Sequence, residues 1–306
     1  MIVRTVLGDV TPDSLGVLDY HEHLFQVSPL LAGDELDDEE RSGVEAGLLR
    51  AAGVRAMIEA TPIGLGRDVE AVARISSTSG LAVVHTTGAH HGGHYPVLPE
   101  YSAARFTADV TDGFLLADGS PARAPDGSPV RAGIAKAGIR YWTIGEFERG
   151  VLEAVAQTSV QTGCAVMVHL DFGSATHEVL DLLGGLGVEP HRVVLAHIDR
   201  NLDPGLHASL AERGAYLGYD GMARHKDASD SAILDCLEAA VAAGAGQRIL
   251  LGGDVARRSR YAAYGGMPGL AYLPQRFLPR VAERVGDDVY RDLTVANGAR
   301  LLAMPA

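Results

Sequence analysis

Two histidines one residue apart are the first residues of this 306-residue chain whose spacing could do chemistry. His21 and His23 lie in the largely apolar run GVLDYHEHLF, residues 16–25. If this run is a β-strand, alternate side chains point to one face, so both imidazoles face the same way. Such a pair can bind a metal ion. Two core histidines with ordinary hydrogen bonds would give the same pattern, so the pair alone leaves both interpretations open.

Four more ionisable residues lie in or at the ends of other apolar runs, namely Lys136, His169, His197 and Asp254. Taken singly, His169 or His197 could be a structural histidine of the core. As a set, four imidazoles, one carboxylate and a lysine on five separate runs favour a metal site. These ligand types suit zinc, with manganese, cobalt or iron as substitutes.

Lysine is the unexpected member of this set. Of 26 basic residues, only Lys136 and Lys226 are lysine. An ammonium would repel a metal ion, whereas a neutral amine can add carbon dioxide and become a carbamate with two oxygens; arginine cannot lose its proton to do so. We interpret Lys136 as such a carbamate (N6-carboxylysine) bridging two metal ions. The alternatives are an ion pair at Lys136, or two lysines kept by chance.

The runs that would position these residues are short, rich in β-formers and eight in number. Several are almost continuously apolar, as expected for parallel strands covered on both faces. The segments between them have helical periodicity, as in residues 146–163, where Gly163 predicts the helix end. The predicted strands are residues 16–24, 54–62, 81–89, 132–139, 165–171, 192–199, 215–221 and 248–254.

Eight strand–helix units in a chain of this length predict an α/β protein of the (β/α)8 TIM-barrel type, whose active site lies at the C-terminal strand ends. The other candidate is an open doubly wound sheet, but no glycine-rich phosphate motif follows the first strand. Two stretches exceed a minimal barrel: the turn-rich residues 118–129, with DGSP twice, and the long connection 255–275 at the catalytic rim. No linker divides the chain, so we predict one domain spanning residues 1–306.

Composition excludes several classes of protein. The net charge of −13 argues against nucleic-acid or membrane-surface partners, which need a basic face. No apolar run is long enough to span a bilayer, and the N-terminus lacks a signal-peptide core. Cys164 and Cys236 are too few for a disulfide framework and are expected to be reduced. We therefore expect a cytoplasmic protein that acts on a small molecule.

The motifs HEH, RAGIAKAG, VMVHLD, RVVLAHID and LLGGD occur in the order and approximate spacing of the phosphotriesterase-like branch of the amidohydrolase superfamily. The chain resembles this family from about residue 5 to the closing TVANGARLLAM. The resemblance implies a binuclear metal hydrolase with a bridging hydroxide and, by analogy, a homodimer. It also implies the ligand sets: His21, His23 and Asp254 for the first ion, His169 and His197 for the second, and the Lys136 carbamate between them.

This chemistry predicts hydrolysis of an ester bond without a covalent enzyme intermediate. Two close divalent ions lower the pKa of a shared water, and Asp254 is the candidate catalytic group that accepts its proton. Organophosphate-hydrolysing relatives have a histidine where this chain has Gly221, and lactonase relatives have a tyrosine where it has His90. Both departures leave the substrate open.

Cations around the rim offer a clue to the substrate. Arginines suit bidentate recognition of phosphate or carboxylate, although ion pairs with nearby acids would also explain them. If they bind substrate, they favour a small anionic lactone, such as a phosphorylated sugar lactone. The rim cations are Arg224, His225, Lys226, Arg257, Arg258 and Arg260, and the expected substrate-binding residues are His90, Tyr219, Arg224, Arg257 and Arg258.

Two further groups are ambiguous. The histidines of HHGGHY, residues 90–95, could bind another metal, but we favour a substrate-facing loop. Tyr141 and Trp142 follow the fourth strand and either line the pocket or pack under the rim.

Three functions remain. The favoured one is a metal-dependent lactonase; the second is a phosphotriesterase. The third, a catalytically inactive barrel acting as a binding protein, is disfavoured because no expected ligand position is substituted.

Overall fold

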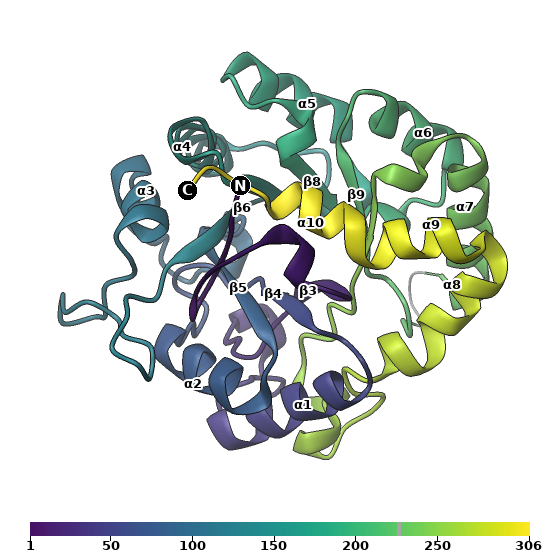
Figure 1. Ribbon diagram of the computed structural model, residues 1–306. Coiled ribbons are helices and arrows are strands. Elements are labelled where there is room, and N and C mark those ends of the chain that lie inside the picture. Colours follow the sequence, from purple (N-terminus) through teal and green to yellow (C-terminus); the bar gives the residue numbers. More distant parts are fainter. Residues whose placement is uncertain (225–227) are drawn as a thin grey trace.

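A curved sheet of eight parallel strands forms the centre of the computed structural model, which describes residues 1–224 and 228–306 (Figure 1). Each strand pairs with its neighbour in chain order. This is the arrangement predicted for a barrel, and all eight predicted strands are present. They are β3 (Leu18–Glu22), β4 (Ala56–Glu59), β5 (Ala82–Gly88), β6 (Ala132–Ile139), β7 (Ala165–Leu170), β8 (Val193–Ala196), β9 (Tyr216–Tyr219) and β10 (Ile249–Leu251).

The helices surround the sheet (Figure 1). Asp38, Asp68, Ser102, Asp203 and Ser229 cap five of them, each accepting a hydrogen bond from a backbone N–H of the first turn. The helices are α1 (Glu39–Ala51), α2 (Val69–Ser79), α3 (Ala103–Thr111), α4 (Glu146–Thr162), α5 (Thr176–Gly185), α6 (Pro204–Glu212), α7 (Asp230–Ala242), α8 (Leu278–Val285), α9 (Asp287–Arg291) and α10 (Asn297–Leu302). None of the described helices is both long and apolar enough to cross a membrane.

Two apolar clusters explain why the strands are apolar on both faces. The larger cluster fills the space between the sheet and the helices. The smaller one lies inside the sheet and includes Tyr20, Ile134 and Leu250. Leu301 and Leu302 of α10 belong to this inner cluster, so α10 covers one end of the barrel, as Figure 1 shows.

The first and last strands meet beside two of the predicted ligands. The backbone N–H of Asp254 donates to the carbonyl of His21 at 2.8 Å. A Cβ at Gly252 would lie 2.9 Å from the His21 nitrogen, so this approach needs glycine. Closure of the barrel therefore brings Asp254 against the HEH motif, although Asp254 lies 231 positions after His23 in the chain.

The segments outside the barrel also follow the sequence predictions. Predicted helix 146–163 is α4, which ends at Gly163 with φ 75°. Each DGSP motif forms a tight turn in which the aspartate accepts from the backbone and hydroxyl of the serine two residues on. The connection 255–275 contains short 3-10 helices at Arg258–Arg260 and Ala262–Tyr264. An antiparallel hairpin of β1 (Val3–Thr5) and β2 (Gly8–Val10) was not predicted.

Candidate metal centre

The predicted first-metal ligands lie together at the C-terminal end of the barrel. His21 and His23 are 1% and 3% exposed, and their ring centroids are 5.4 Å apart. Asp254 Oδ1 lies 3.8 Å from His21 Nε2 and 3.6 Å from His23 Nε2. These three side chains are close enough to share one ion.

Hydrogen bonds behind His23 leave its Nε2 free to act as a ligand. The Thr61 hydroxyl donates to the Phe25 carbonyl at 2.6 Å, so its oxygen accepts from His23 Nδ1 at 2.7 Å. A neutral imidazole carries one proton. With that proton on Nδ1, the lone pair of His23 lies on Nε2 and faces Asp254.

Asp220 fixes two other histidines in the same way. Its Oδ2 lies 3.1 Å from His21 Nδ1 and its Oδ1 lies 2.6 Å from His197 Nδ1, while Tyr20 donates its hydroxyl to the same carboxylate. Burial alone would raise the pKa of Asp220, but His197 and His21 hold it well below its usual range. An ionised carboxylate only accepts, so both histidines donate from Nδ1 and present Nε2 lone pairs to the cavity.

His169 and His197 form the second predicted pair. His169 Nε2 lies 2.9 Å from Asp171 Oδ1 and donates to it, which leaves a lone pair on Nδ1. That Nδ1 lies 2.7 Å from His197 Nε2, whose lone pair points back at it. Two facing lone pairs repel each other, so such a pair needs a proton between its nitrogens or a cation bound to both from one side. Burial lowers the pKa of His197 to about 4 and that of His169 well below its usual value, so the pair suits a metal ion better than a proton.

Lys136 lies on β6 between these groups and is 1% exposed. Its Nζ donates to the Ala60 carbonyl at 2.8 Å and lies 3.4 Å from His21 Nε2. Burial lowers its pKa to about 8, so a fraction of the amine is neutral at pH 7. A neutral buried amine beside the histidines has the reactivity that carbamate formation requires.

Two arginines hold the far oxygen of Asp254. Arg200 donates to Asp254 Oδ2 at 3.2 Å, and Arg224 donates to the same atom and to the backbone carbonyl. Burial would raise the pKa of Asp254, but Arg224 and His21 keep it well below its usual value. The carboxylate is therefore charged, with Oδ1 directed at the histidines.

A cavity of about 150 Å³ opens above these residues. His90, Arg224 and Arg257, three of the five predicted substrate-binding residues, line it. His225 and Lys226 lie outside the described residues. The lining also includes Gln26, Leu31, His94, Arg200 and Ala256.

The prediction for Tyr219 is wrong. Tyr219 is fully buried, and its hydroxyl lies 2.6 Å from His207 Nδ1 on the outer side of the sheet. Neighbouring residues of a strand point to opposite faces, so the inward position belongs to Asp220.

Arg258 also departs from the prediction, since it is absent from the cavity lining that the described residues form. Its guanidinium lies 3.6 Å from Asp37 and over the ring of Tyr264. The contacts of Arg258 therefore agree with the alternative interpretation, an ion pair at the rim. Arg257 keeps its place at the cavity although it also lies 3.7 Å from Asp34.

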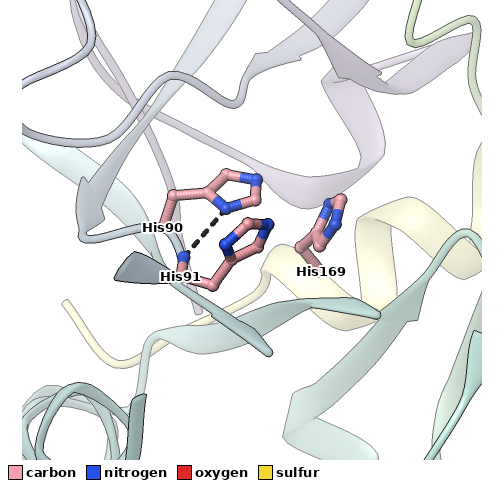
Figure 2. Close-up of side chains that lie close together, drawn as sticks. All are labelled: His90, His91 and His169. Atoms are coloured by element: carbon pink, nitrogen blue, oxygen red, sulfur yellow. Dashed lines mark hydrogen bonds between the residues drawn. The ribbon is translucent and has the colours of Figure 1, made fainter. Parts of the chain in front are cut away.

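The extra histidines gather beside His169, as Figure 2 shows for His90 and His91. His90, His91 and His169 are close enough to share an ion. However, His90 Nδ1 accepts from the His91 backbone N–H at 2.8 Å, and His91 Nδ1 accepts from Gly93 at 3.1 Å. With these lone pairs in use, each neutral ring carries its proton on Nε2. His90 and His91 are therefore better suited to donate hydrogen bonds from Nε2 than to bind a further metal ion.

Sequence reasoning did not single out the residues that orient the ligands. Asp220, Thr61, Asp171 and Arg200 each contact a predicted ligand directly. One signal was available: Asp220 follows β9 directly, as His197 follows β8, at the strand ends where a barrel carries its site.

One match with known protein families establishes the family of this chain. The model of the Phosphotriesterase family matches residues 1–302. The chain belongs to the phosphotriesterase family. A phospho-furanose lactonase of Mycoplasmopsis agalactiae is 30% identical over 98% of this chain and 91% of its own length. The structure of a lactonase from Listeria monocytogenes matches with a TM-score of 0.88 and 27% identity, covering all of both chains.

A third member of the phosphotriesterase family has a ligand in its site. The Escherichia coli phosphotriesterase homology protein, complexed with phosphate in its active site, matches with a TM-score of 0.83 and 26% identity. The match covers 95% of this chain and all of the other. This family membership confirms the predicted resemblance, the TIM-barrel fold and hydrolase activity.

Proposed function

We propose that this phosphotriesterase-family chain is a metal-dependent lactonase that hydrolyses a small anionic lactone, in particular a phosphorylated sugar lactone. The observation that carries the proposal is that His169 Nδ1 and His197 Nε2 face each other at 2.7 Å beside the His21, His23 and Asp254 cluster. The phospho-furanose lactonase of Mycoplasmopsis agalactiae supports the substrate class.

In this proposal His21, His23 and Asp254 would hold one divalent ion, His169 and His197 would hold the other, and Lys136, as a carbamate, would be a ligand to both. Zinc suits these ligands, with manganese, cobalt or iron as substitutes. When bound, such ions supply a hydroxide at neutral pH and polarise the lactone carbonyl.

The chain's own residues then bind the substrate and move a proton. Asp254 would accept the proton of the attacking water, and Arg200 and Arg224 on Oδ2 keep this carboxylate in place. His90 donates a hydrogen bond from Nε2 to the substrate. Arg224 and Arg257 bind its anionic group, since both line the cavity.

Other properties belong to the same proposal. We propose that residues 1–306 form one domain, that the protein works in the cytoplasm, and that it forms a homodimer by analogy with its family. The negative net charge supports a small-molecule partner rather than nucleic acid.

Phosphotriester hydrolysis is less favoured. Organophosphate-hydrolysing relatives carry a histidine where this chain has Gly221. A Cβ at Gly221 would lie 3.0 Å from Asp199 Oδ2, which accepts the Gly221 backbone N–H at 2.7 Å. At the position of that histidine, this chain therefore has a glycine whose backbone N–H is bound by the buried Asp199 carboxylate.

The test is an assay of the zinc- and manganese-loaded protein on a phosphorylated sugar lactone beside a neutral aryl phosphotriester. We expect kcat/KM to be at least 100-fold higher for the lactone. Equal values, or a preference for the phosphotriester, would overturn the substrate assignment.

Lys136→Ala tests the metal centre separately. We expect activity to fall at least 1000-fold and the metal content to drop below two ions per chain by mass spectrometry, because the bridging carbamate is lost. Millimolar short-chain carboxylic acids should restore part of the activity. Full activity and full metal content in this variant would contradict the bridging role.

A further inference from the structure

Three large aromatic side chains lie exposed beside the metal cavity. Tyr141 and Trp142 follow β6, and Phe172 follows β7; they are 58%, 62% and 57% exposed. Single exposed aromatics are ordinary on protein surfaces. These three line one cavity of about 500 Å³ together with Ser174, Arg200 and Asn201. This answers the question that the sequence left open for Tyr141 and Trp142: they line a pocket and do not pack under the rim.

The backbone is in an unfavourable conformation at two of these three residues. Trp142 and Phe172 have φ values of 47° and 55°, in the left-handed region that bulky residues rarely adopt. Such a conformation is unfavourable for these residues and persists only where neighbouring contacts impose it. Here the Trp142 N–H donates to Ser174 Oγ at 3.0 Å, and that hydroxyl donates to the Asp171 carbonyl at 2.8 Å.

The rings themselves are arranged against each other. Tyr141 and Phe172 meet edge to face, with centroids 5.9 Å apart and planes at 88°. This geometry favours a fixed pair, because the ring edge of one lies on the face of the other. The cavity therefore has an apolar wall in which two of the three rings contact each other.

The aromatic cavity borders the proposed active site at Arg200. Arg200 lines both cavities and donates to Asp254 Oδ2 at 3.2 Å. Asp171, which supports the Ser174 hydroxyl, also accepts from His169 Nε2 at 2.9 Å. The aromatic wall and the proposed metal ligands are therefore held by shared residues, Arg200 and Asp171.

Volume indicates which part of a ligand lies there. Pockets for small organic ligands commonly measure about 300–1,000 Å³. The cavity above the histidines is smaller, at about 150 Å³, so it has room for the small anionic lactone of the proposed function but little more. A ring carried on that lactone would extend beyond it, and the 500 Å³ cavity shares Arg200 with it.

We infer that Tyr141, Trp142 and Phe172 form a second substrate subsite that binds a ring with an apolar face, carried on the substrate beyond its lactone. The inference rests on the proposed function for the reacting end of the substrate. Aromatic faces bind such rings by stacking, and Ser174, Arg200 and Asn201 supply hydrogen bonds at the ring edge. The subsite selects for lactones that carry a ring substituent.

The only tryptophan of the chain gives a direct readout, because Trp142 lies in the subsite. Its fluorescence is titrated with γ-phenyl-γ-butyrolactone and, as matched control, with γ-butyrolactone, using protein with bound metal and protein freed of metal. We expect the phenyl compound to change the emission and to reduce quenching by acrylamide at least twofold, in both forms. The unsubstituted lactone should do neither.

Variants connect binding with selectivity. Tyr141→Ala should weaken binding of the phenyl lactone at least fivefold by fluorescence. Trp142→Ala should lower the ratio of kcat/KM for the phenyl lactone over γ-butyrolactone about tenfold through KM, and Trp142→Phe should retain most of it. Val160→Ala, at an exposed apolar side chain on α4, is the control that should change neither quantity.

The outcomes separate this inference from the proposed function. Binding of the phenyl lactone without any lactonase activity would leave the subsite standing and remove the lactonase assignment. Lactone hydrolysis with no response of Trp142 to the phenyl compound would overturn the subsite. A third outcome is that the emission of Trp142 depends on protein concentration and not on ligand, and that Trp142→Ala dissociates a dimer in sedimentation. This result would overturn the subsite and make this face an interface between copies of the chain.

Discussion

Asp220 connects the two halves of the proposed metal centre at the level of single residues. One oxygen accepts from His21, assigned to the first ion, and the other accepts from His197, assigned to the second. A carboxylate that orients two ligands sets both ring tautomers at once. Tyr20 donates to the same group from the barrel interior and adds a third contact.

We predict that Asp220→Asn lowers metal affinity 10- to 100-fold and reduces kcat/KM with it. The amide nitrogen donates, so one of the two histidines loses its acceptor and its ligand lone pair is no longer fixed on Nε2. Metal affinity is measured by competition with a chelator. The matched control is Tyr20→Phe, which removes one contact to Asp220 but leaves both histidine contacts, so its effect should be several-fold smaller. An Asp220→Asn protein with unchanged affinity would contradict the orienting role.

The connection after β10 shows how one element directs neighbouring arginines to different places. Arg257 precedes the 3-10 helix Arg258–Arg260 in extended backbone and reaches the metal cavity. Arg258 begins that helix and turns to Asp37 and Tyr264. Two adjacent residues of the same type therefore have different expected effects on substrate binding.

Arg257→Ala is expected to raise KM for a phosphorylated lactone about tenfold and to leave KM for a neutral lactone within twofold. The loss of one charged contact to phosphate accounts for this size of effect. Arg258→Ala provides the matched control, with KM for both lactones unchanged. Steady-state kinetics on the two substrates measures the difference, and equal effects of the two variants would remove Arg257 from the anion site.

The molecule as a whole buries many carboxyl groups around its barrel. Burial raises the pKa of Asp19 to about 8 and the pKa values of Glu59 and Asp199 to about 7. A carboxyl whose pKa is higher in the folded than in the unfolded protein holds an extra proton when folded. Folding stability then falls as pH rises from the unfolded value near 4 towards the folded value.

We therefore predict that Glu59 lowers the stability of the metal-free protein between pH 5 and pH 8, while buried histidines with lowered pKa values, such as His197, raise it over the same range. Differential scanning calorimetry measures the change. Because Glu59→Gln removes one carboxyl with a raised pKa, its melting temperature should fall less, or rise more, from pH 5 to pH 8 than that of the unmodified chain. Added zinc should offset the loss at pH 8 more than at pH 5, since a cation favours ionised carboxylates and unprotonated imidazoles. A Glu59→Gln protein whose melting temperature changes with pH in the same way as that of the unmodified chain would contradict the raised pKa of Glu59.

The barrel and the predicted metal ligands could be derived from the sequence because both depend on local pattern. Apolar runs separated by helical segments define the eight strands, and a parallel barrel collects whatever polar residues end them. This rule alone groups four of the predicted ligands, His21, His23, Lys136 and Asp254. Closure of the sheet at Gly252 then brings Asp254 next to His21.

Other features were decided by the tertiary structure alone. Sequence spacing does not say that Tyr219 faces the helices, that Arg258 turns to Asp37, or that Asp220 lies between two histidines from different strands. Each depends on the direction of a side chain relative to segments far away in the chain, and packing of those segments sets that direction. The aromatic subsite is of the same kind, because Phe172 lies 30 positions after Trp142 and only folding places their rings on one cavity.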